Sequence, residues 1–236
     1  MSQALDLKNN SQGSRPVTGA LRFVVLLGIV SLFSDMTYES ARSLYGPFLG
    51  SLGASAFVVS VIAGIGELLG FGLRLLSGRF SDRTRRYWTI AIIGYFISLV
   101  SVPALALAAS WPVAISLVLA ERVGKAIRKP PRDAMLSRAA QEIGVGWGFG
   151  LHQAMDQTGA LLGPIMVAIV FAHSRQYQSA FSFLVIPAVL SISFLLLAKS
   201  RFPQPRNLEI KLVRVETFCV VLPNKDATMN ICSCLS

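Results

Sequence analysis

Charged side chains lie inside the apolar segments of this sequence, at spacings that put them on shared helix faces. Residues three, four or seven positions apart lie on one side of an α-helix. Four groups follow this rule: Asp35, Glu39 and Arg42; Glu67 and Arg74; Glu121 and Lys125, with Arg122 beside them; and His152 and Asp156. A charged residue at the centre of a membrane helix costs about 2.5 to 3.5 kcal/mol on insertion scales, so these groups indicate a solute or ion pathway.

The acidic and basic members of this set suggest different roles. Our hypothesis is that Asp35, Glu39 or Asp156 carries a coupling proton, because each would be desolvated near mid-membrane and can bind a proton or a neighbouring cation. The basic side chains would hold anionic groups of a solute or serve as counter-ions; they are Arg42, Arg74, Arg122 and Lys125. Their excess favours an anionic solute. The alternative is a static charge network that only orders the helices.

His152 and Asp156 also have the spacing of a metal or acyl-transfer pair. No second histidine lies nearby, and the acyltransferase spacing is different. We therefore expect no catalytic residue, metal site or cofactor.

The elements that position these residues follow from composition. The chain has 236 residues, of which 53% are hydrophobic and 14% charged, with a formal net charge of +10. A soluble domain usually carries about a quarter charged residues, so this composition predicts a membrane protein. The basic residues come in short clusters between apolar runs, which indicates membrane topology rather than nucleic-acid binding.

Six apolar runs are long enough to span a bilayer, which needs roughly 20 residues. We place them near 21–49, 56–77, 88–109, 112–131, 145–172 and 178–198. The sequence thus predicts an all-α membrane protein with a leader at 1–20, a six-helix bundle at 21–200 and a polar tail at 201–236, disordered or aberrant. No cleavage site follows the first run, so we expect it to be retained as a span.

Lysine and arginine predict the orientation of these spans. With six spans, every basic cluster falls on one side; the clusters lie in the leader, after span two, after span four and after span six. The opposite side holds only Arg175. The positive-inside rule then puts both termini in the cytoplasm, in a plasma membrane such as the bacterial inner membrane.

The charged spans follow a repeating order along the chain. Spans one, two, four and five carry the charges, whereas spans three and six carry none. This order predicts a three-plus-three inverted repeat, in which four helices face a shared aqueous cavity and spans three and six face lipid.

One loop resembles the signature of the major facilitator superfamily. The segment from Gly78 to Arg86 matches that signature at Gly78, Ser81, Asp82, Arg83 and Arg86, whereas Phe80 replaces a leucine and Arg85 replaces a glycine of the tight turn. The resemblance implies half of a major facilitator fold that moves a small solute by alternating access. It also implies that Asp82 and the arginines form a latch against a facing half.

Two other segments are similar to motifs of the same family. Gly159, Gly163 and Pro164 resemble the glycine-proline motif of its antiporters, which slightly favours antiport over simple helix packing. Arg122 is loosely similar to the family's fourth-helix arginine. We interpret the following segment, 128–133, as the end of that helix and a cytoplasmic loop.

The last residues differ in character from the rest. Residues 201–236 are polar and contain no seventh span, and Cys219, Cys232 and Cys234 read as free thiols. Because complete family members have twelve spans, we expect either a truncated product or a half-transporter that pairs with a second chain. The alternative function is a non-transporting membrane module.

Overall fold

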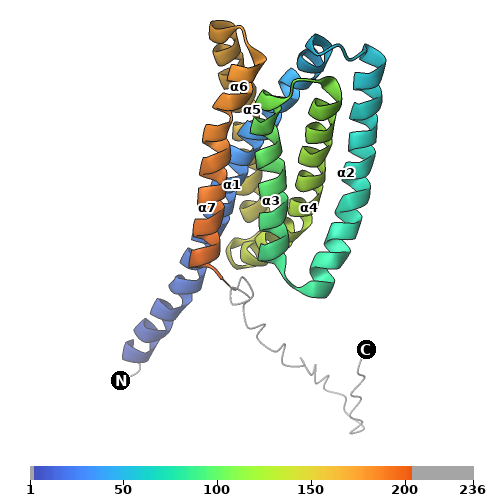
Figure 1. Ribbon diagram of the computed structural model, residues 1–236. Coiled ribbons are helices and arrows are strands. Elements are labelled where there is room, and N and C mark those ends of the chain that lie inside the picture. The colour runs from blue at the N-terminus through green and yellow to red at the C-terminus, as the bar shows by residue number, and fades with distance from the viewer. Residues whose placement is uncertain (1–2, 204–236) are drawn as a thin grey trace, which may run out of the picture.

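The computed structural model describes residues 3–203, with side chains from Thr18 onward. The chain forms an elongated bundle in which successive long helices run antiparallel (Figure 1). The elements are α1 (Gln3–Ser51), α2 (Ala56–Thr84), α3 (Tyr87–Ala104), the 3₁₀ turn η1 (Leu105–Leu107), α4 (Trp111–Ile143), α5 (Val145–Ser174), α6 (Tyr177–Phe183) and α7 (Val185–Arg201). The tail and its cysteines lie outside the described residues.

Five of the helical segments within the described residues are long and apolar enough to cross a membrane: Thr18–Ser51, Ala56–Thr84, Tyr87–Leu107, Val145–Ser174 and Tyr177–Arg201. The sixth long helix, α4, differs because acidic and basic residues interrupt its apolar face. Since α4 packs against α1, α2, α3 and α5, protein surrounds most of those charges. The prediction of an all-helical membrane bundle with six long rods is confirmed.

The bundle has two apolar clusters with polar residues between them. One cluster, near the end where α3 begins and α7 ends, includes Phe23, Trp88 and Leu195. The other, at the opposite end, includes Phe48 and Phe181. The charged residues of α1, α4 and α5 lie between these clusters. The apolar clusters at the two ends hold the helices together.

Helix α2 is the least covered rod. It packs chiefly on α4, and its outer face is apolar, with Phe57 and Leu75 77% and 79% exposed. A membrane helix satisfies its backbone internally and needs only apolar side chains toward lipid. This face therefore suits a bilayer.

Prolines shape the third and sixth rods. Pro187 cannot donate a backbone hydrogen bond to Phe183, and the rod breaks there into α6 and α7 at Leu184. Pro103 stands at the end of α3, where the chain tightens into η1.

The expected end of the fourth helix is wrong. Pro130 and Pro131 lie inside α4, which continues to Ile143, so residues 128–133 are helical and not a loop. Pro131 leaves the carbonyl of Ile127 without its usual backbone donor, and the hydroxyl of Ser77 on α2 donates to that carbonyl at 2.8 Å. This bond from a neighbouring helix satisfies the carbonyl that Pro131 leaves free.

The tight turn after α2 forms although a glycine is missing. Arg85 has φ +56°, in the left-handed region, and its N–H donates to the carbonyl of Ser81 at 2.8 Å. Helix α2 runs to Thr84, so Gly78, Asp82 and Arg83 belong to its last turns. Asp82 accepts a hydrogen bond from the hydroxyl of Tyr87 at 3.4 Å.

Candidate functional site

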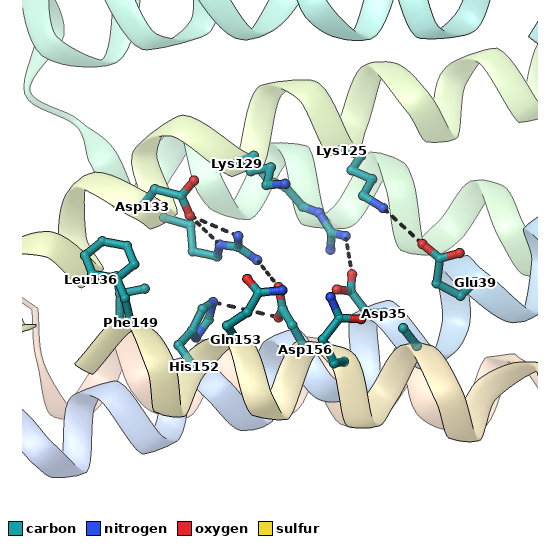
Figure 2. A pocket seen from close by; sticks show the side chains of 14 residues that line it. Asp35, Glu39, Lys125, Lys129, Asp133, Leu136, Phe149, His152, Gln153 and Asp156 are labelled. Atoms are coloured by element: carbon teal, nitrogen blue, oxygen red, sulfur yellow. Dashed lines mark hydrogen bonds and ion pairs between the residues drawn. The ribbon is translucent and has the colours of Figure 1, made fainter. Parts of the chain in front are cut away.

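A polar cavity of about 270 Å³ opens between α1, α4 and α5 (Figure 2). Five residues singled out from the sequence line it: Asp35, Glu39, Lys125, His152 and Asp156. Helix α1 supplies the first two, α4 the third and α5 the last two. The helical spacing therefore brings these groups to one place, as expected.

Helix α4 forms the cationic wall of this cavity. Lys125, Arg128, Lys129 and Arg132 recur three or four residues apart and all line the cavity. Arg128 and Arg132 are only 3% and 6% exposed. Two guanidinium groups are thus held away from water inside the bundle.

Serines of α1 orient these arginines. Arg132 donates from Nη1 to the hydroxyl of Ser31 at 2.6 Å, and Arg128 donates to the hydroxyl of Ser34. The Arg128 guanidinium also lies 4.4 Å from the centre of the Tyr95 ring on α3. Both arginines thus have partners besides the carboxylates across the cavity.

The ion pairs that join α4 to α1 and α5 in this cavity are longer than hydrogen bonds. Arg128 lies 3.7 Å from Asp35, and Arg132 lies 3.9 Å from Asp156. Arg132 makes a closer pair, 2.9 Å, with Asp133 on its own helix. The carboxylates of α1 and α5 are attracted to the arginines without being locked to them.

Lys125 joins α4 to α1 at the far end of the cavity. Its ammonium lies 3.8 Å from Glu39 and 2.9 Å from the centre of the Tyr38 ring. Glu39 also pairs with Arg42 at 3.8 Å, one turn along α1. A desolvated cation over an aromatic face is stabilised by about 2 kcal/mol.

His152 does not form a catalytic relay with Asp156. Nε2 lies 3.4 Å from the hydroxyl of Ser31 and 3.8 Å from Asp156, so both neighbours lie near the same ring nitrogen. In a relay, the acid would hold the opposite nitrogen. Among the described residues, Nδ1 has no partner, and no three metal-ligating side chains cluster.

A second cavity, of about 400 Å³, lies between α1, α2 and α4 toward the end of the bundle opposite the termini. Three residues of the predicted set line it: Arg42, Glu67 and Arg122. Arg122 donates to Glu67 at 2.6 Å and covers Gly66, where a Cβ would overlap its side chain. The predicted residues are thus divided between two cavities, whereas a single shared one was expected.

Two residues of the predicted set line neither cavity. Arg74 lies on α2 with its guanidinium 5.3 Å from the centre of the Phe71 ring. Glu121 is buried in α4 at 1% exposure. Neither of these two cavities is lined by α3, α6 or α7.

The cavity charges correct one inference from the sequence. The first cavity is lined by four basic residues, Lys125, Arg128, Lys129 and Arg132, and by four acidic ones, Asp35, Glu39, Asp133 and Asp156. The expected excess of basic groups is absent from this cavity, because Arg42 and Arg122 line the second cavity and Arg74 lines neither. The lining charge therefore does not favour an anionic solute.

Sequence reasoning missed two arginines and two serines of this site, for different reasons. Arg128 and Arg132 continue the spacing of Glu121 and Lys125, and this continuation was the available signal. The paired prolines hid it by suggesting a helix end. Ser31 and Ser34 carried no signal, because serine is common in membrane helices and its partners are distant in the sequence.

The glycines of α5 allow α1 to approach closely. A Cβ at Gly159 would overlap the carbonyl of Leu32, and one at Gly163 would overlap the carbonyl of Met36. Small residues permit such backbone contact between membrane helices. This contact sets the distance between Asp35 on α1 and Asp156 on α5.

Comparison with known proteins gives the family. Residues 27–227 match the Major Facilitator Superfamily. The chain is 46% identical over 197 residues to uncharacterized proteins of Mycobacterium bovis and Mycobacterium tuberculosis, covering 83% of this chain and 48% of each relative. It is 31% identical over 209 residues to an uncharacterized MFS-type transporter of Methanocaldococcus jannaschii, covering 87% of this chain and 50% of that protein.

The chain thus spans about half the length of the relatives that it matches. The family match, the helical bundle and the membrane-spanning segments agree, and the family is one of transporters rather than enzymes. This integral membrane protein belongs to the Major Facilitator Superfamily.

Proposed function

We propose that the chain forms the amino-terminal half of a transporter that moves a small solute by alternating access, coupled to a proton and working as an antiporter. A facing half would complete the translocation pathway. The loop with Gly78, Asp82, Arg83 and Arg86 would latch against that half, and both termini would lie in the cytoplasm.

The observation that carries this proposal is the charged cavity between α1, α4 and α5. Its arginines are fixed by Ser31 and Ser34, whereas Asp35 and Asp156 lie 3.7 and 3.9 Å from them. A carboxylate held loosely in this way can exchange a proton or a bound cation without displacing its arginine. Alternating access requires such interactions, which differ between two states of the site.

The experiment compares two preparations of membrane vesicles. One contains this chain alone, and the other contains it together with the part of the Mycobacterium bovis relative that it does not match. Radiolabelled metabolites and drugs are offered under an inward and an outward proton gradient. We expect at least one solute to move only in the paired preparation and only while the gradient lasts.

A matched pair of variants tests the coupling. Asp35→Asn should abolish gradient-driven movement of that solute, whereas Asp133→Asn should retain it, because Asp133 pairs within α4 and does not bridge helices. Unchanged coupling in Asp35→Asn, Glu39→Gln and Asp156→Asn would remove proton coupling through these acids. Stable insertion of both halves without flux of any solute would favour the non-transporting module.

A further inference from the structure

Glu121 differs from the other acids of the bundle interior. Its side chain is 1% exposed, and neither carboxyl oxygen has a hydrogen-bond partner among the described residues. In the same part of the chain, the other acids of the predicted set each have an ion pair: Asp35 with Arg128, Glu39 with Lys125, Glu67 with Arg122, and Asp156 with Arg132. Glu121 has none.

The cations that act electrostatically on Glu121 have other ion-pair partners. Arg122, Lys125 and Arg128 of its own helix act on it electrostatically, but they pair with Glu67, Glu39 and Asp35. From α1, the side chains that act on it are Glu39, Tyr38 and Tyr45. The hydroxyl of Tyr45 is also buried without a partner among the described residues.

Burial without partners is unfavourable for a carboxylate. An ionised carboxyl group removed from water and given no hydrogen bond loses far more free energy than a neutral one, so such groups take up a proton instead. A protonated carboxyl group is a small polar group that the interior tolerates. The surroundings of Glu121 therefore suit the acid form.

Glu121 also lies between the two cavities. Val118 and Arg122 line the second cavity, and Lys125, one turn further along α4, lines the first. Glu121 lines neither. A group in this position is within one helical turn of both compartments but is open to neither.

We propose that Glu121 is a proton-carrying residue of this protein, protonated in the described state. It releases the proton when a movement of α4 against α1 exposes it to a cavity. The O–H bond breaks, the proton passes to water, and the carboxylate that remains is stabilised by Lys125 or Arg122. The use of this proton in transport rests on the proposed function, whereas the protonation itself does not.

Infrared spectroscopy of the chain in lipid vesicles at neutral pH tests the protonation. A protonated carboxyl group in an apolar environment gives a carbonyl stretch well separated from those of carboxylates and amides. We expect the wild-type chain to show this band and Glu121→Gln to lose it, at an intensity of one carboxyl group per chain. Glu67→Gln is the matched control and should leave the band unchanged, because Glu67 is half exposed and bonded to Arg122.

Retention of the band in folded Glu121→Gln, or its absence in the wild-type chain, overturns the proposal. If Glu121→Gln does not fold, Glu121→Asp is measured instead, and the band must then change frequency; an unchanged band overturns the proposal as well. No solute enters this experiment. If the carbonyl band is present but no solute moves in the transport screen, only the proposed function is refuted. If a solute moves but the band is absent, only the role of Glu121 is refuted.

Discussion

The two cavities use the same chemistry in different surroundings. In the first, Arg128 and Arg132 are almost fully buried, are bonded to serines and lie 3.7 to 3.9 Å from the carboxylates of the other helices. In the second, Arg122 contacts Glu67 at 2.6 Å, but the Glu67 side chain is 51% exposed. Short distance alone does not measure the strength of an ion pair. Solvent around Glu67 supplies much of the electrostatic stabilisation that the arginine would otherwise give to the carboxylate.

The walls of the two cavities also differ in how closely their helices pack. On the α5 side, glycines bring the helix against the backbone of α1, whereas on α2 the glycines Gly64, Gly70 and Gly72 face open space. The first cavity is therefore held by backbone contact and buried charge. The second depends on one half-exposed ion pair and on a helix that packs chiefly against α4.

The largest expected effect comes from removing a buried cation. Arg132→Gln should lower the free energy of unfolding by about 3 to 5 kcal/mol, because Asp156 and Asp133 lose their guanidinium partner while buried or half-buried. Glu67→Gln, in the second cavity, should change it by about 1 kcal/mol or less. Denaturant unfolding in mixed micelles measures both; equal losses would erase the contrast between the cavities.

A smaller effect should follow from removing a serine that orients an arginine. Ser31→Ala should lower the free energy of unfolding by about 1.5 to 3 kcal/mol, because Arg132 is a buried charged donor and loses the hydroxyl oxygen that accepts its hydrogen bond. Ser116→Ala is the control, since its hydroxyl bonds only within its own exposed turn. The same unfolding assay applies. A Ser31 variant as stable as the Ser116 variant would show that Arg132 keeps its position without the serine.

The smallest effects separate the two helix contacts. Gly159→Ala should destabilise by about 1 to 3 kcal/mol, because the added methyl group overlaps the carbonyl of Leu32. Gly70→Ala should stabilise by about 0.4 to 1 kcal/mol, because the site is open and alanine favours helix. Thermal unfolding of the two variants, compared with wild type, checks the signs; a stabilising Gly159→Ala would mean that α5 shifts away from α1 easily.

The bundle and most of its polar residues could be predicted from local pattern. Apolar length located the helices, and helical spacing brought Asp35, Glu39, Lys125, His152 and Asp156 to one cavity. These properties depend on neighbours within a few turns of the same helix, so one sequence is enough to find them.

The remaining features depend on contacts between distant residues. Helix α4 continues across Pro130 and Pro131, and the hydroxyl of Ser77 on α2 bonds to the freed carbonyl of Ile127; no local rule shows this contact. For this reason, the sequence predicts a loop at Arg128 and Arg132. The division into two cavities likewise depends on how α2 and α5 sit on either side of α1 and α4, which the spacing of charges does not specify. The inverted repeat stays a prediction.

The bond from Ser77 to Ile127 has a mechanical consequence for the rods that it joins. Two adjacent prolines deprive α4 of consecutive internal hydrogen bonds at the level of its buried arginines, which makes this level the softest point of the rod. Any bend there pulls on the one side chain from α2 that secures the freed carbonyl. A change in the curvature of α4 is thus transmitted to α2 near the Gly78–Arg86 segment, while the glycine contact between α5 and α1 stays in place.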